Sequence, residues 1–202
     1  PKHFLQTYPQ ATMDVVEIDP GLTAIAQEHF RLPEEHPRLH IYHEDGRTYL
    51  NRSEKTYDVI FGDAFSSHYS IPFHLTTKEA VQRKHDLLSK DGAVVLNIIS
   101  SLTEETGRFL RAEYATYQSV FPHVLLFPVS YPGSPDRVQN VILVASKRDR
   151  LPPSTSLDPE IDRMLSHFYD EELPADMPVL TDDYAPVDFY IHEILRTIPA
   201  GS

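Results

Sequence analysis

Short apolar segments alternate along the chain with segments whose apolar residues recur every three or four positions. The first pattern is typical of buried strands and the second of helices that bury one face. Strands are predicted over residues 13–18, 39–42, 57–61, 93–99, 124–129 and 141–146. Strands that alternate with helices predict an α/β fold built on a doubly wound, mostly parallel sheet.

Two helices have clear start signals in the sequence. Asp19 is a good N-cap, and Pro20 fits the first turn of a helix that reaches about Phe30. Thr76 and Glu79 have the spacing of a capping box and predict a helix to about Leu88. A further helix is expected over 103–120, with apolar side chains on one side.

The second half of the chain predicts a buried strand, a hairpin and a tail. Residues 93–99 form a continuous β-branched run after a turn at 90–92, as in a central strand covered on both faces. The connection between the strands at 124–129 and 141–146 is too short for a crossover helix, so these strands are expected to pair antiparallel.

We expect residues 1–148 to form one α/β domain. Residues 149–202 begin with a proline-rich linker and continue with a short helix and an extended tail that pack on the same domain.

Composition narrows the classes of function. The 202 residues carry a formal net charge of −12, which disfavours nucleic acid as a partner, and they contain no cysteine, so disulfides and thiolate metal sites are excluded. No stretch approaches the roughly 20 apolar residues that cross a membrane. The 11 histidines show no metal-binding spacing, so no metal site is expected. A cytoplasmic protein with no membrane partner is therefore predicted.

Acidic residues follow three successive predicted strands. Glu17 is placed to bind ribose hydroxyls, since Asp19 is already explained as a helix cap. Asp45 could accept from an adenine amino group, with Gly46 allowing a close backbone approach. Asp63 precedes a polar loop and could lie beside the reacting atoms. Because ligands bind beyond the carboxyl ends of parallel strands, these acids form the candidate site.

Five segments, in order and spacing, resemble the spermidine synthase family of polyamine aminopropyltransferases: VVEIDPGL, HEDGRTYL, YDVIFGDAFS, IPFHLTTKEA and LSKDGAVVLNI. The resemblance covers about residues 1–147. It implies a Rossmann-like sheet of the class I methyltransferase type with a C-terminal antiparallel hairpin. It also implies that the family's first strand and glycine-rich loop are missing from this chain.

The resemblance further implies roles for individual residues. Glu17 would hold the ribose of the co-substrate, decarboxylated S-adenosylmethionine or S-adenosylmethionine, and Asp45 with Gly46 would meet its adenine. Asp63 would orient and deprotonate a small amine substrate. Tyr131 and Asn97 would line the amine site, and a homodimer is compatible with the family.

One position departs from the family and keeps other functions open. Ser66 stands where spermidine synthases have a second acid, and it is the candidate substrate-binding residue at this position. The leading hypothesis is aminopropyl transfer to a small amine. An S-adenosylmethionine-dependent methyltransferase acting on a small molecule and a non-catalytic spermidine-synthase-like domain are the alternatives.

Overall fold

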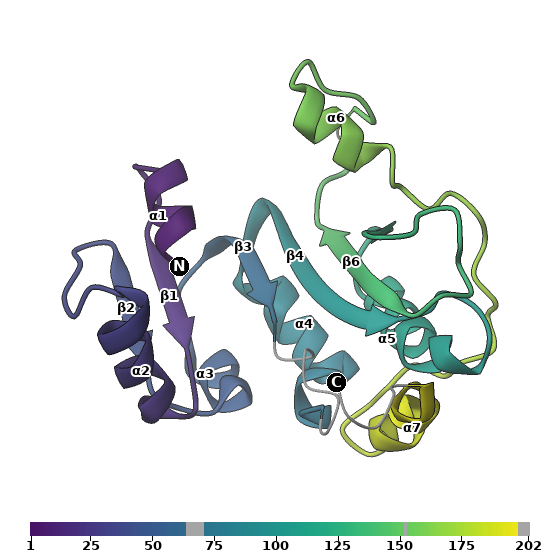
Figure 1. Cartoon of the computed structure of the whole chain (residues 1–202). Coiled ribbons are helices and arrows are strands. Elements are labelled where there is room, and N and C mark those ends of the chain that lie inside the picture. Colours follow the sequence, from purple (N-terminus) through teal and green to yellow (C-terminus); the bar gives the residue numbers. More distant parts are fainter. Residues whose placement is uncertain (64–70, 152, 198–202) are drawn as a thin grey trace. The chain divides into compact units, whose positions relative to one another are not determined.

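The computed structural model describes residues 1–63, 71–151 and 153–197 of the chain (Figure 1). These residues form two compact units, Pro1–Ser53 and Glu54–Ser202, which are called unit 1 and unit 2 below. Each unit combines a parallel strand pair with helices, which confirms the predicted α/β class.

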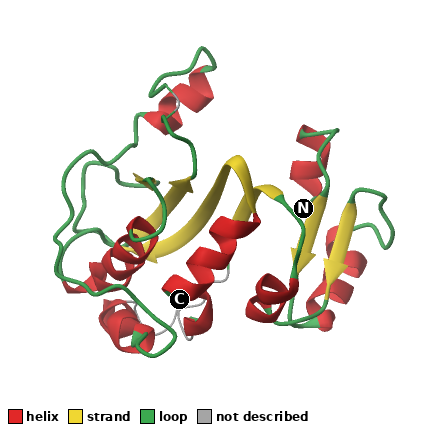
Figure 2. Cartoon of the chain, turned by 180° about the vertical axis from the view of Figure 1, so that it is seen from behind, coloured by secondary structure: helices red, strands yellow, loops and turns green. Residues whose placement is uncertain are grey.

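Unit 1 is a small structure with the element order α1-β1-α2-β2-α3. Its elements are the strands β1 (Met13–Val16) and β2 (Leu39–Tyr42) and the helices α1 (Lys2–Thr7), α2 (Pro20–Phe30) and α3 (Gly46–Arg52). The strands β1 and β2 pair in parallel, and in Figure 2 the two arrows of this unit point the same way. The predicted bounds of β2 and the end of α2 are confirmed, whereas α3 was not predicted.

Unit 2 contains a four-stranded mixed sheet with the order β3-β4-β6-β5. Its strands are β3 (Tyr57–Gly62), β4 (Leu88–Ser100), β5 (His123–Pro128) and β6 (Gln139–Ser146). The pair β3–β4 is parallel, and β6 is antiparallel to both β4 and β5, which confirms the predicted hairpin. It follows that β5 runs in the same direction as β3 and β4, so these three strands have their carboxyl ends at one edge.

Helices cover one face of this sheet. The helices of unit 2 are α4 (Lys78–Leu87), α5 (Arg108–Gln118), α6 (Pro159–Leu165) and α7 (Val187–Thr197), with the short 3₁₀ turns η1 (Phe73–Leu75) and η2 (Glu105–Gly107). Helix α6 has no buried residue and projects away from the sheet (Figure 1). The helices α4 and α5 pack together against the sheet, and α7 packs on α5. Residues Val94, Leu96 and Ile98 of β4 are fully buried beneath them.

The opposite face of β4 is only half-buried. Alternate residues of the strand, from Ala93 to Ile99, are of intermediate exposure, so the expectation of cover on both faces is wrong for the described residues of unit 2. The expected turn at 90–92 is also wrong, because these residues belong to β4. They form an irregular stretch there, since Tyr57 pairs with Leu88 while Val59 already pairs with Ala93.

The predicted capping box of α4 is shifted by one residue. Thr77, and not Thr76, is the N-cap, and its side chain accepts from the backbone N–H of Ala80. Glu79 instead accepts from the backbone N–H of Asp182 at 3.0 Å. The Glu79 carboxylate therefore accepts from the C-terminal segment, and not from the N-cap residue as a capping box requires.

Helix α7 replaces the end of the expected extended tail. Val187, Tyr190, Ile191 and Ile194 are buried at helical spacing, and the first three join the core cluster of unit 2. The segment before α7 is held to the rest of the unit by Arg111, whose Nε and Nη2 donate to the carboxylate of Asp176 at 2.7 and 2.8 Å.

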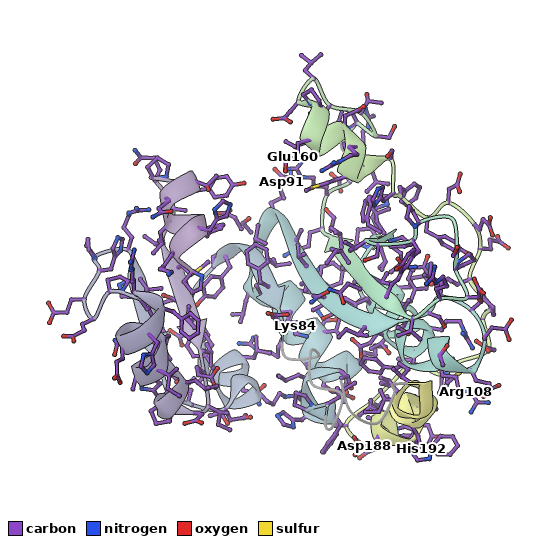
Figure 3. The ribbon with its side chains drawn as sticks, viewed as in Figure 1. Lys84, Asp91, Arg108, Glu160, Asp188 and His192 are labelled. Atoms are coloured by element: carbon purple, nitrogen blue, oxygen red, sulfur yellow. The ribbon has the colours of Figure 1, made fainter. Side chains whose placement is uncertain are left out.

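A carboxylic acid lies in the middle of this core. Glu113 on α5 is fully buried, and its two carboxyl oxygens have no hydrogen-bond partner among the described residues. Burial raises the pKa of Glu113 to about 8, although the nearby Lys84 ammonium opposes the shift. Lys84, which lies on α4 (Figure 3), donates to the hydroxyl of Tyr117 at 2.8 Å and to the carbonyl of Leu75 at 2.9 Å.

The buried acid predicts a stability that falls as pH rises. The folded protein keeps the Glu113 proton up to a higher pH than the unfolded chain does. The stabilisation of the folded state by this proton is therefore complete below the ordinary pKa of 4.5 and is lost as pH rises toward 8. We expect Glu113→Gln to remove this loss. In thermal unfolding, the Tm advantage of the variant over the wild type should therefore grow from pH 5.5 to pH 8.5.

Glu160→Gln is the matched control, because Glu160 is exposed on α6 (Figure 3). It should leave the pH dependence of Tm unchanged. A Tm difference between Glu113→Gln and wild type that is the same at every pH would contradict the assignment of a raised pKa to Glu113.

Candidate functional site

The first candidate residue, Glu17, lies directly after the last paired residue of β1. Val16 pairs with Tyr42, and the backbone N–H of Glu17 still donates to the carbonyl of Tyr42 at 3.0 Å. The carboxyl ends of β1 and β2 therefore lie at the same edge of the strand pair. This places the segments that carry Glu17 and Asp45 at one edge of unit 1, as the sequence predicts.

The side chain of Glu17 is partly buried and has a local partner. Its Oε1 accepts from the backbone N–H of Asp19 at 2.9 Å. Asp19 in turn accepts from the backbone N–H of Gly21 at 2.8 Å and is the N-cap of α2, which confirms its predicted role. Glu17 is thus oriented by the start of a helix without being its cap.

Asp45 has a structural role that the sequence analysis did not foresee. Its Oδ1 accepts from the backbone N–H of Thr48 at 2.8 Å, which makes it the N-cap of α3, and Gly46 is the first residue of that helix. Helix capping was the reason to set Asp19 aside as a ligand, and the same reason now applies to Asp45. Its contact with adenine stays a prediction.

An ion pair beside Asp45 completes this edge. The guanidinium of Arg52 donates to both carboxylate oxygens of Glu44, through Nε at 2.8 Å and through Nη2. It also lies over the rings of Tyr49, at 5.1 Å, and Tyr42. The hydrogen bond from Arg52 lowers the pKa of Glu44. No motif in the sequence pointed to this pair, because its partners are eight residues apart across a helix that was not predicted.

In unit 2, the candidate catalytic acid is at the end of β3. Asp63 directly follows Gly62, the last residue of the strand, and is exposed. Asn97, on the adjacent strand β4, donates from Nδ2 to Asp63 Oδ1 at 3.4 Å. The structure therefore brings together two residues that the sequence analysis selected separately. The Oδ1 atom of Asn97 is buried and has no hydrogen-bond partner among the described residues.

Tyr131 lies in the loop that follows β5, whose carboxyl end is at the same edge as that of β3. The side chain of Tyr131 is 43% exposed. The guanidinium carbon of Arg137 lies 3.7 Å from the centre of its ring, a contact that the sequence analysis did not anticipate. Ser66, the third predicted substrate residue, lies outside the described residues.

A hollow in unit 1 is separate from the predicted nucleoside residues. It has a volume of about 720 Å³ and lies against α2, β2 and the loop before β2. Thr23 and His43, which contact each other at 3.0 Å, are among its lining residues, but Glu17 and Asp45 are not. We therefore do not assign the nucleoside to it.

Two further findings concern ligands and membranes. Among the residues that the structure describes, no three histidine or acidic side chains are grouped so that they could hold a metal ion. In the same part of the chain, no helix is long and apolar enough to cross a membrane.

Comparison with known proteins decides the family. The profile of the Spermine/spermidine synthase domain matches residues 4–150, which is well over half of the chain. The chain belongs to the spermine/spermidine synthase family. The predicted resemblance is thereby confirmed, and the matched region includes Glu17, Asp45, Asp63, Asn97 and Tyr131.

The chain is similar to individual proteins with aminopropyltransferase and with methyltransferase names. A polyamine aminopropyltransferase of Vibrio vulnificus is 37% identical over 133 residues, covering 64% of this chain and 42% of the relative. An N-terminal histidine N-methyltransferase of Emericella nidulans is 32% identical over 152 residues, covering 72% of this chain and 26% of the relative.

Solved structures support the predicted fold. A probable spermidine synthase from Corynebacterium glutamicum superposes with a TM-score of 0.66 at 26% identity, over 85% of this chain and 59% of that one. Methyltransferases of lower identity share the arrangement, so the fold is the Rossmann-like, class I methyltransferase type. The chain spans less than two thirds of these spermidine synthase relatives.

Proposed function

We propose that the protein containing this chain is an aminopropyltransferase that moves the aminopropyl group of decarboxylated S-adenosylmethionine to a small amine. The observation that carries the proposal is the Asp63–Asn97 pair at the carboxyl edge of a spermidine-synthase domain. A carboxylate there can attract an ammonium and accept its proton, and the buried Oδ1 of Asn97 can accept a hydrogen bond from the same group.

The proposed reaction is a displacement at carbon. The neutral amine nitrogen forms a bond to the aminopropyl carbon next to the sulfonium, and the C–S bond breaks. Its electron pair stays on sulfur, which leaves methylthioadenosine. The amine loses one proton, and Asp63 is the proposed acceptor. Orientation of the amine in line with the leaving sulfur supplies much of the acceleration.

The remaining predicted residues receive binding roles in this proposal. Glu17 would accept hydrogen bonds from the ribose hydroxyls, and Asp45 with Gly46 would meet the adenine. Tyr131 and Ser66 would contact the amine. Residues 1–148 would form the nucleoside-binding domain, on which residues 149–202 pack. A homodimer and a cytoplasmic location also stay predictions.

A methyltransferase is the second candidate function. The methyltransferase relative from Emericella nidulans favours it, as does Ser66 in place of the second acid of spermidine synthases. Such an enzyme could use Glu17 and Asp45 in the same way and would not need Asp63 as a base for a diamine.

Nucleoside binding to the intact protein separates the two candidates. Aminopropyl transfer leaves methylthioadenosine, whereas methyl transfer leaves S-adenosylhomocysteine, which has an amino-acid chain with an α-ammonium and an α-carboxylate in place of the S-methyl group. Calorimetry should give a lower Kd for methylthioadenosine. Tighter binding of S-adenosylhomocysteine would favour the methyltransferase, and no binding of either would favour a non-catalytic domain.

A further inference from the structure

The loop that carries Tyr131 is held by one buried side chain from the following strand. Gln139, the first residue of β6, is 6% exposed. Its Oε1 accepts from the backbone N–H groups of Ser130 at 3.1 Å and Tyr131 at 2.7 Å. Its Nε2 donates to the carbonyl groups of Tyr131 at 3.0 Å and Ser134 at 3.3 Å. One amide side chain thus binds both backbone polar groups of Tyr131.

The backbone of Gln139 is held in place by strand pairing in the sheet. Its backbone pairs with Ser100 at the carboxyl end of β4, and Ser100 is fully buried. On the far side of the loop, the carbonyl of Pro135 accepts from the backbone N–H of Leu102 at 2.8 Å. The Tyr131 loop is therefore connected to the last residue of β4, the strand that also carries Asn97, and to Leu102 just beyond it.

The hydrogen-bonding pattern of Gln139 is specific to an amide. A carboxylate could accept from the two N–H groups but would face the two carbonyl oxygens without a proton to donate. An apolar side chain would leave the backbone N–H groups of Ser130 and Tyr131 without their acceptor. The carbonyl groups of Tyr131 and Ser134 would each keep one backbone N–H donor, from Ser134 at 3.0 Å and from Arg137 at 3.2 Å. The ring of Tyr131, in contrast, stays exposed on the surface of the loop, with Arg137 over one face. The side chain is therefore available to a ligand while its backbone is fixed.

We propose that Gln139 is a positioning residue that orients Tyr131 toward the amine acceptor. This inference rests on the proposed function, in which Tyr131 contacts the amine. Gln139 does not touch the substrate, and it acts by fixing the backbone from which the tyrosine ring projects. Its loss should therefore weaken use of the acceptor and leave use of the nucleoside donor unchanged.

The test is Gln139→Met in the intact protein, with decarboxylated S-adenosylmethionine as donor and putrescine as acceptor. We expect the KM for putrescine to rise about tenfold, a change equivalent to one or two hydrogen bonds, while the KM for the donor changes less than twofold. Hydrogen exchange at the Ser130 and Tyr131 amides should become faster by a similar factor, because both lose their acceptor.

Two controls separate positioning from a general loss of stability. Gln82→Met makes the same change at an exposed residue of α4, whose amide contacts Asp86, and should alter neither KM. Thr116→Val removes a buried hydroxyl of α5 that bonds to Ala112 and Leu180, and should lower Tm without a selective change in the KM for putrescine.

The outcomes are distinct. Unchanged exchange at Ser130 and Tyr131 would overturn the inference, and so would equal changes in the two KM values of Gln139→Met. A wild-type protein that transfers nothing from the donor would instead refute the proposed function, whatever the exchange of the loop amides shows.

Discussion

Asp63→Asn should lower the rate of aminopropyl transfer by about 10²- to 10⁴-fold, the usual contribution of a general base. Asparagine has nearly the same shape, so it keeps a hydrogen-bond acceptor near Asn97. It cannot take the proton of the amine or balance its charge. Methylthioadenosine should bind to the variant with unchanged affinity, since the nucleoside is assigned to other residues. Steady-state rates and calorimetry on the intact protein measure the two effects separately.

Asp91→Asn is the matched control for this change. Asp91 is exposed in the irregular stretch near the start of β4 (Figure 3), whereas Asn97 lies near the carboxyl end of the same strand. The same substitution there should leave the transfer rate unchanged. If Asp63→Asn formed product at the wild-type rate, Asp63 would not be the base.

Glu17→Ala should abolish measurable binding of methylthioadenosine. A charged acceptor bonded to two ribose hydroxyls contributes about 1.5–3 kcal/mol for each bond, so their loss corresponds to at least a 100-fold rise in Kd. Alanine also removes the acceptor for the backbone N–H of Asp19. Glu17→Gln keeps that acceptor but loses the charge, so it should weaken binding by a smaller factor than alanine.

Glu28→Ala serves as the control for the nucleoside site. Glu28 lies on the exposed side of α2, in the same unit as Glu17, and its side chain is 75% exposed. Its removal changes the charge of the unit by the same amount but should leave the Kd unchanged. Unchanged affinity in Glu17→Ala would refute the ribose assignment.

Much of the fold could be predicted because local signals agreed with tertiary structure. The bounds of β2, the capping role of Asp19 and the antiparallel hairpin follow from apolar runs, a cap residue and a short connection. The elements that were missed had weaker or competing signals. Helix α3 has seven residues and begins with glycine, too short to show a helical period. Helix α7 did show apolar spacing, at Val187, Tyr190, Ile191 and Ile194, but follows a segment that reads as an extended tail.

Contacts between residues that are far apart in the sequence could not be predicted. The shift of the α4 cap to Thr77 depends on Asp182, whose backbone N–H takes Glu79, more than 100 residues earlier, as its acceptor. Lys90 to Gly92 have turn-forming residues, yet they lie inside β4, in the irregular stretch between Leu88 and Ala93, the partners of Tyr57 and Val59 on β3.

In the candidate site, too, local features could be predicted and long-range contacts could not. The order of acids after the strands could be predicted, because strand ends are local features. The bond between Asp63 and Asn97 and the contacts of Gln139 depend on strand pairing. Asp45 was recognised as a strand-end acid, but its role as the cap of α3 was hidden because that helix was not predicted.

The most direct test of aminopropyl transfer is to identify the products that the intact protein forms. The protein is incubated with putrescine and either decarboxylated S-adenosylmethionine or S-adenosylmethionine, and the mixture is analysed by mass spectrometry. Aminopropyl transfer predicts spermidine and methylthioadenosine in equal amounts with the first donor and no methylated amine with the second. Methylated putrescine with S-adenosylmethionine, and no spermidine with the decarboxylated donor, would contradict it.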